Sequence, residues 1–141
     1  MVWGDWLREK LTRREAEHLR RGRLGEKAAK RYLKKAGLKF LTSNFRTQRG
    51  EIDLIFRDNE CLVFVEVKTR SSEDWVRPAA AVDAGKKRRL SRVALSYLRK
   101  LDNRQVKFRF DIVEVLWGEG QAREVRHLPN AFALAKPYRH H

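Results

Sequence analysis

The sequence has little of what disulfide-linked, zinc-binding and membrane-spanning proteins are built from. A single cysteine among 141 residues excludes a disulfide framework and a zinc site made of several cysteines. It fits a reducing compartment, so we expect a cytoplasmic protein. No apolar run approaches the roughly 18 residues that a membrane-spanning helix needs, and the charged N-terminus lacks the apolar segment of a secretory signal. We therefore expect no membrane partner.

Acidic residues are also scarce, because 18 Asp and Glu stand against 33 Lys and Arg, a formal net charge of +15. Hydrophobic residues make up 42% of the chain, which together with the glycines comes close to the share of an ordinary globular domain. We therefore expect one folded domain rather than a disordered basic tail. A net charge of magnitude about 2–8 already keeps a small domain in solution. The positive charge beyond this range predicts a polyanionic partner, most simply nucleic acid.

The spacing of apolar residues predicts the secondary structure, since a period of 3.6 indicates helices and a period of two indicates strands. We expect helices over 3–20, 24–36 and about 90–101, with Gly22 and Gly25 separating the first two, and strands over 39–41, 51–57, 61–68, 106–116 and 124–128. This order predicts an α/β fold, a mixed sheet with helices packed against it. We expect an N-terminal helical extension at 1–22, a core domain at 23–135 and a tail at 136–141.

The strand predicted over 61–68 carries an acid where a central strand usually has valine. Its residues are apolar on both faces as far as Glu66, which is typical of a strand buried on both sides. An ionised carboxylate there costs several kcal/mol unless a cation or hydrogen bonds compensate it. Lys68 follows two residues later, so its side chain leaves the strand on the same face as that of Glu66.

A second acid, Asp53, lies on the preceding strand. Alternation over 51–57 predicts two faces, one with Ile52, Leu54 and Phe56 and the other with Glu51, Asp53 and Ile55. The short connection between the strands allows a hairpin that pairs Asp53 with Val65 or Glu66. Two carboxylates and an amine then converge. Carboxylates, waters and a substrate phosphate suit Mg²⁺ or Mn²⁺, and such an ion lowers the pKa of a bound water for phosphodiester hydrolysis.

Structural alternatives to a metal site remain open at this point. Lys68 can form an ordinary ion pair with Glu66 or with Asp53 at the end of a sheet. Glu26 is a fourth candidate, since helical spacing puts it at the edge of the buried stripe, within reach of the sheet end. Its alternative is an exposed pair with Lys30, worth only about 0.3–0.5 kcal/mol.

Several short segments recur in the order found in one known family. They are Gly25-Glu26-x-Ala28-Ala29, Asn44-Phe45-Arg46, Gly50-Glu51-Ile52-Asp53-Leu54-Ile55, Val63-Phe64-Val65-Glu66-Val67-Lys68-Thr69-Arg70, Arg77-Pro78, Ala81-Val82, Lys86, Arg109-Phe110-Asp111 and Asn130-Ala131-Phe132. Over about residues 22–132 the chain closely resembles the YraN-like family, uncharacterised protein family 0102. That family resembles Holliday-junction resolvases and restriction endonucleases, which share the PD-(D/E)xK nuclease core.

The resemblance implies a restriction-endonuclease-like mixed central β-sheet flanked by helices, forming a nuclease-like core at 23–135. Carried over by position, it assigns Glu26, Asp53, Glu66 and Lys68 as catalytic residues, with Asp53 and Glu66 as metal ligands. It implies a Mg²⁺- or Mn²⁺-dependent endonuclease for branched or structured DNA in repair or recombination. It also implies a homodimer, because a resolvase cuts two strands symmetrically. One departure is Ile52, which stands where the nuclease pattern has proline before the first acid.

Further residues are candidates for supporting roles. Phosphate contacts, or alternatively solvated surface charges, are expected at Arg46, Arg49, Arg70, Lys86, Lys87, Arg88 and Arg89. Glu51 is either a secondary acid of the site or a residue that shapes the turn after Gly50. Asp111 is expected to be a buried structural acid paired with an arginine. Trp75 either stacks on a base or packs in the core.

Two other functions stay open beside the nuclease. The first is a nucleic-acid-binding accessory protein that does not cleave, although a pure binder has no need of two acids facing phosphate. The second is an RNA-processing nuclease, which nothing in the sequence excludes.

Overall fold

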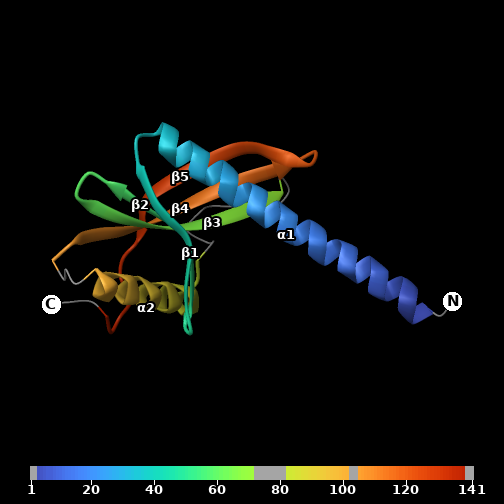
Figure 1. The fold of residues 1–141 in the computed structure, drawn as a ribbon, viewed down its shortest axis with the longest axis horizontal. Helices are drawn as coiled ribbons and strands as arrows, with labels where there is room; N and C mark the ends of the chain where they lie inside the picture. Colours follow the sequence, from blue (N-terminus) through green and yellow to red (C-terminus); the bar gives the residue numbers. More distant parts are fainter. Residues whose placement is uncertain (1–2, 72–81, 102–104, 139–141) are drawn as a thin grey trace.

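The computed structural model describes residues 3–71, 82–101 and 105–138, and Trp75 lies outside them. Its elements, drawn in Figure 1, are α1 (Trp3–Lys35), β1 (Lys39–Thr47), β2 (Gly50–Asp58), β3 (Cys61–Ser71), α2 (Ala84–Lys100), β4 (Lys107–Gly118) and β5 (Gln121–Phe132). The predicted order of the core elements is confirmed, and every strand extends further than predicted at one end or both. Among the described residues, no helix combines the length and apolarity needed to cross a membrane.

Helix α1 is continuous over 33 residues, so the break predicted at Gly22 and Gly25 is wrong. A glycine inside a helix costs only about 1 kcal/mol relative to alanine, and strong helix formers flank both positions. The C-terminal half of α1 packs on the sheet, whereas its N-terminal half extends past it (Figure 1). Packing explains Gly25, because a Cβ there would lie 2.1 Å from Oγ1 of Thr69 in β3. The division of the chain into extension, core and tail stays a prediction.

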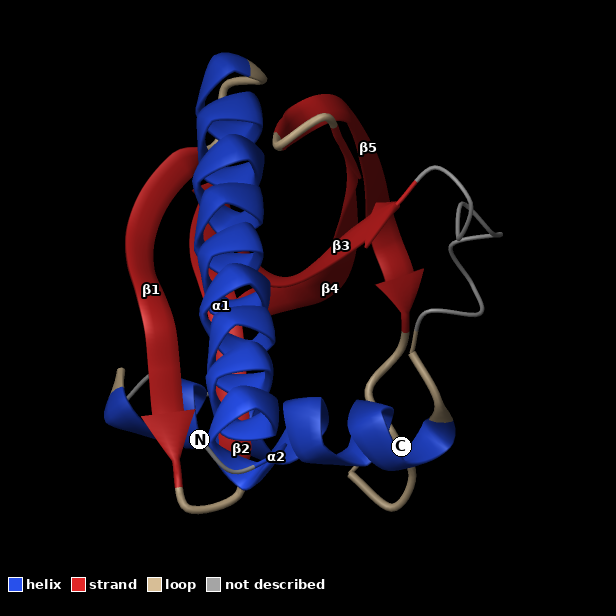
Figure 2. Ribbon diagram, turned by 90° about the vertical axis from the view of Figure 1, so that its right-hand side faces the viewer, coloured by secondary structure: helices blue, strands red, loops and turns tan. Residues whose placement is uncertain are grey.

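The strands form one sheet in the order β1-β2-β3-β4-β5. β3 and β4 are parallel, and the other neighbours are antiparallel. A parallel pair needs a crossover connection, which contains α2. Figures 1 and 2 show α1 and α2 on different sides of the sheet. The predicted mixed sheet flanked by helices is therefore confirmed.

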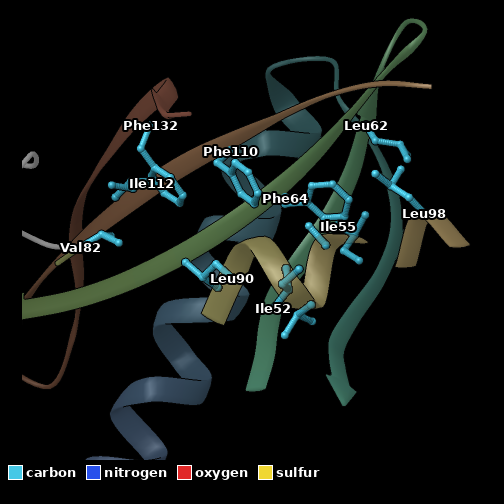
Figure 3. Close-up of a cluster of buried hydrophobic side chains, with 12 residues drawn as sticks. Ile52, Ile55, Leu62, Phe64, Val82, Leu90, Leu98, Phe110, Ile112 and Phe132 are labelled. Carbon is cyan, nitrogen blue, oxygen red and sulfur yellow. The ribbon is translucent and has the colours of Figure 1, made fainter. Parts of the chain in front are cut away.

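Each face of the sheet buries its own hydrophobic cluster. The cluster on the α2 face, shown in Figure 3, includes Ile52, Ile55, Leu62, Phe64, Val82, Leu90, Leu98, Phe110, Ile112 and Phe132. The cluster on the α1 face consists of Ala29, Leu33, Leu54, Phe56, Val63, Val65, Val113 and Val115. Successive residues of β3 alternate between the two clusters, which confirms the prediction that this strand is buried on both sides. The same alternation places Glu66 on the α2 face.

Strand β2 changes face at Asp53. Ile52 packs in the α2 cluster together with Ile55, whereas Leu54 and Phe56 pack in the α1 cluster. The predicted face shared by Ile52, Leu54 and Phe56 is therefore wrong for Ile52. Strict alternation fails here, and Asp53 lies at the point where it fails.

The neighbouring strand β1 is also irregular beside Asp53. Asn44 has a positive φ of 52° and lies between two paired positions of the β1–β2 ladder. Asparagine tolerates this left-handed conformation better than most residues.

Candidate functional site

The acids and the lysine singled out in the sequence lie around one pocket of about 590 Å³. It is lined by His18, Arg21, Gly22, Glu26, Asp53, Glu66, Val67, Lys68, Thr69, Arg70 and Lys86. The structure thus brings together Glu26, Asp53, Glu66 and Lys68 from α1, β2 and β3. It adds Lys86 from α2, along with a group of α1 residues that precede Glu26.

Asp53 is held by the backbone of the neighbouring strand. Its Oδ2 accepts a hydrogen bond from the Val67 N–H at 2.8 Å. The ladder pairs Leu54 with Val65, which confirms the predicted hairpin and sets Asp53 beside Glu66. Burial first, and next the Glu66 carboxylate, raise the pKa of Asp53 to about 8. A neighbouring like charge disfavours the ionised form, so a proton or a nearby cation stabilises this pair of carboxylates.

Glu66 is compensated by two lysines. Lys86 Nζ lies 2.5 Å from Glu66 Oε1, and Lys68 Nζ lies 3.5 Å from the same oxygen. The Glu66 side chain is only 7% exposed, so a charge there requires such partners. The ion pair of Glu66 with Lys68 is therefore present. The closer partner, however, is Lys86, which the sequence indicated only as a phosphate contact.

The two lysines differ in how firmly they hold a proton. Burial, followed by the hydrogen bond with Lys86, lowers the pKa of Lys68. Burial acts on Lys86 as well, but its hydrogen bonds with Glu66 and Lys68 outweigh it and raise the pKa of Lys86. The start of α2 fixes the backbone of Lys86, because Asp83 caps the helix by accepting a hydrogen bond from the Lys86 N–H at 2.8 Å. Lys68 is therefore the amine better suited to exchange a proton.

Glu26 reaches the pocket from α1, and Asn44 connects it to the sheet. The Asn44 Nδ2 donates to Glu51 Oε1 at 2.7 Å and to Glu26 Oε2 at 3.3 Å. Arg46 pairs with the other oxygen of Glu51 at 3.0 Å. Burial first, and then the charges of Glu51 and Glu66, raise the pKa of Glu26 against the effect of the Asn44 hydrogen bond. Glu51 thus supports the site through Asn44 without lining the pocket.

Asn44 is a polar residue of the site that sequence reasoning missed. The strand was expected to end at residue 41, which left Asn44 in a loop, and its one signal was the shared Asn44-Phe45-Arg46 segment. The alternative for Glu26, an exposed ion pair with Lys30, is not observed among the described residues. The Lys30 ammonium lies instead over the Phe40 ring, 3.8 Å from its centroid.

The pocket suits a divalent cation that is held by few protein ligands. The described residues contain no group of three or more His, Cys, Asp or Glu that could enclose a metal ion. Mg²⁺, however, commonly takes one or two carboxylates and completes its octahedron with waters and substrate phosphate. Asp53 and Glu66 offer such a pair, and their mutual repulsion favours a cation between them. The donor set therefore fits Mg²⁺ or Mn²⁺.

Of the other basic candidates, Arg70 also lines the pocket. The candidates that do not line it are Arg46, Arg49, Lys87, Arg88 and Arg89. All of these except Lys87 are exposed, and the Lys87 ammonium lies 5.8 Å from the centroid of the Phe132 ring. Their role as phosphate contacts stays a prediction.

Asp111 is fully buried and paired with an arginine, as expected. Its carboxylate accepts hydrogen bonds from Arg109 and the Asn130 N–H, and it lies 2.7 Å from His127 Nε2. Burial alone would raise the pKa of Asp111, but these partners lower it overall. Arg109 also reaches Asp58 at 2.9 Å, so the cluster joins the β2–β3 turn to β4 and β5.

The fold and the pocket define a mixed α/β protein in which adjacent central strands bring an acid and an acid-x-lysine pair to a site between two helices. The chain belongs to uncharacterised protein family UPF0102, whose sequence model matches residues 25–115. The resemblance to the YraN-like family is thereby confirmed.

Relatives of known sequence cover most of the chain. It is 42% identical over 114 residues to a UPF0102 protein of Geobacter metallireducens, which covers 81% of this chain and 93% of the relative. It is 50% identical over 112 residues to a UPF0102 protein of Coxiella burnetii, covering 77% and 88%. It is 39% identical over 117 residues to a UPF0102 protein of Rhodococcus opacus, covering 83% and 99%. The family match includes Glu26, Asp53, Glu66, Lys68 and Lys86, and it begins after Gly22.

Proposed function

We propose that this protein is a Mg²⁺- or Mn²⁺-dependent endonuclease that hydrolyses phosphodiester bonds in DNA. The observation that carries the proposal is the pair of neighbouring carboxylates, Asp53 and Glu66, in a pocket that also contains Glu26 and two lysines. Branched or structured DNA as substrate, a place in repair or recombination, and a homodimeric state rest on the resemblance of the family to resolvases.

The electrostatics of the pocket favour a functional site over a structural ion pair. In a structural ion pair, one acid is stabilised by one base. Here a second acid, Asp53, lies beside Glu66, and burial together with the Glu66 charge raises the pKa of Asp53. Strongly perturbed groups in a cleft are concentrated at catalytic and binding sites. The net charge of +15 supplies the attraction for a polyanion, while the acids occupy the pocket itself.

Each residue has a distinct role in the proposed reaction. Asp53 and Glu66 would hold the metal ion, which when bound neutralises phosphate charge and acidifies a water. Lys68, with its lowered pKa, orients the attacking water or accepts its proton. Lys86 keeps its proton and donates to a phosphate oxygen. Glu26 completes this set of acids from the α1 side of the pocket.

Cleavage by wild type and by Glu66→Gln tests the proposal. Labelled four-way junction, duplex and single-stranded DNA, together with RNA of the same sequence, are incubated with Mg²⁺ or Mn²⁺. We expect metal-dependent cleavage by wild type and background levels for Glu66→Gln. Glu60→Gln removes the same charge at the exposed β2–β3 turn, so it serves as the control that keeps wild-type activity. Calorimetric titration of the metal into the same proteins measures metal binding.

The outcomes separate the three functions. Undiminished cleavage by Glu66→Gln would refute the assigned site. Tight DNA binding by wild type, without metal uptake or cleavage, would favour the accessory protein. Preferential cleavage of the RNA would favour the RNA-processing nuclease.

A further inference from the structure

One part of the pocket is basic. It is separated from the acids both along helix α1 and along strand β3. On α1, His18 precedes Glu26 by eight residues, about 12 Å along the helix axis. On β3, Arg70 follows Glu66 by four residues, about 13 Å along the strand. Arg21 and Gly22 line the pocket on the same stretch of α1. The pocket therefore has an acidic part and a basic part.

Two guanidinium groups of the basic part have donors without acceptors. The Nε atoms of Arg21 and Arg70 are shielded from solvent, and neither has a hydrogen-bond partner within the described residues. A buried N–H without a partner is unfavourable, and guanidinium groups match the geometry of phosphate oxygens. Within the described residues these two Nε atoms hold no acceptor, and both side chains line the pocket, where a phosphate group would supply acceptors to their guanidinium groups.

Gly22 leaves room for a ligand beside these arginines. A Cβ at Gly25 would collide with Thr69, but one turn earlier a Cβ at Gly22 would meet nothing within 4 Å. Packing therefore does not require glycine at this position, and the helix is weaker for it. Glycine does allow a ligand to approach the backbone closely.

The overall positive charge of the chain does not explain why Arg21 lines the pocket. The α1 overhang, residues 3–21, carries six Lys and Arg against four Asp and Glu. Arg13 pairs with Glu9 and Arg20 pairs with Glu17 on the exposed surface of the overhang. Arg21 differs from these two arginines because it lines the pocket.

We propose that Arg21, Gly22 and Arg70, with the exposed His18 beside them, form a second phosphate subsite. It holds a backbone phosphate of the same DNA strand to one side of the phosphate at the acidic part, and so positions the strand for cleavage. This inference rests on the proposed nuclease function. Arg21 and Gly22 precede the region matched by the family model, so the α1 overhang adds a substrate contact to the family core.

Binding of labelled four-way junction and duplex DNA by the full chain, measured by fluorescence anisotropy without divalent metal across a salt series, tests the subsite. Arg21→Gln should weaken binding about tenfold and reduce the slope of log affinity against log salt by about 0.9. Arg20→Gln removes the same charge one residue away, outside the pocket, and should change affinity less than about twofold.

A glycine pair provides the second control. Gly22→Leu should weaken binding, whereas Gly4→Leu, at another open position of α1, should not. Both changes should raise the melting temperature, since leucine favours the helix, so the loss of binding cannot come from unfolding. In the cleavage assay Arg21→Gln should raise KM and leave kcat nearly unchanged.

The subsite is refuted if Arg21→Gln and Arg20→Gln weaken binding equally, or if Gly22→Leu binds like wild type. If the wild type cleaves DNA but Arg21→Gln and Arg20→Gln bind alike, the proposed nuclease function stands and the subsite is refuted. If the wild type never cleaves, but Arg21→Gln selectively weakens DNA binding, the subsite stands and the nuclease function is refuted.

Discussion

Replacing Asp53 by asparagine should stabilise the metal-free protein at neutral and alkaline pH. Burial and the Glu66 charge raise the pKa of Asp53 from 3.8 to about 8, so the folded state binds this proton more tightly than the unfolded state. The stability that the carboxyl contributes is fully present below about pH 4 and is lost as the pH rises to about 8. Asparagine stays neutral, and its oxygen can still accept the Val67 hydrogen bond.

The size of the effect follows from the pKa. A rise from 3.8 to about 8 corresponds to an upper limit of roughly 6 kcal/mol. Relaxation and water entry reduce this figure, because buried sites respond with an effective dielectric constant near 20. We expect Asp53→Asn to gain about 2 kcal/mol at pH 8 and above, which raises the melting temperature by about 6 °C. The gain should vanish near pH 4.

Urea unfolding in EDTA across this pH range measures the difference, and excess Mg²⁺ should reverse it. Wild type gains about 2.7 kcal/mol when the metal is at a hundredfold its Kd, whereas the variant gains little. Glu60→Gln, at an exposed turn, should follow wild type throughout. The reasoning is refuted if Asp53→Asn is less stable than wild type in EDTA at alkaline pH. An equal Mg²⁺ effect on both proteins would remove Asp53 from the metal ligands.

Two further substitutions test the packing that supports the site. Gly25→Ala should destabilise the protein by about 1–3 kcal/mol in urea unfolding, despite the helix preference of alanine, because its Cβ would lie 2.1 Å from Thr69 Oγ1. A gain in stability would contradict the observed contact. Asp111→Asn should cost about 3 kcal/mol at neutral pH, since Arg109 would lose a buried charged partner. The pKa of Asp111 is lowered on folding, so its contribution exists above the unfolded pKa and disappears as the pH falls through the folded value. A difference that stays constant down to about pH 2 would contradict this assignment.

Much of the fold followed from residues close together in the sequence. Alternating apolar residues located β2, and a run that is apolar on both faces located β3. The short connection between them set the register that places Asp53 beside Glu66. The i, i+2 spacing put Lys68 on the face of Glu66. These relations depend on strand geometry and a tight turn, both of which are local.

The errors arose where packing overrides local preference. Glycine at positions 22 and 25 predicted a break in α1, but the contact with Thr69 requires a small residue at Gly25 inside an unbroken helix. Strict alternation predicted the wrong face for Ile52, because β2 changes face at Asp53 beside the positive φ of Asn44.

Local spacing was enough to predict the order of the core elements and the buried central strand. Spacing along one hairpin also predicted that Asp53, Glu66 and Lys68 meet. The distant residues that complete the pocket depend instead on how the helices pack. Lys86 reaches Glu66 because a parallel crossover carries α2 back across the sheet, and Arg21 lines the pocket because an unbroken α1 continues past it. Both contacts depend on how helices pack on opposite faces of the sheet, which no spacing within a single segment encodes.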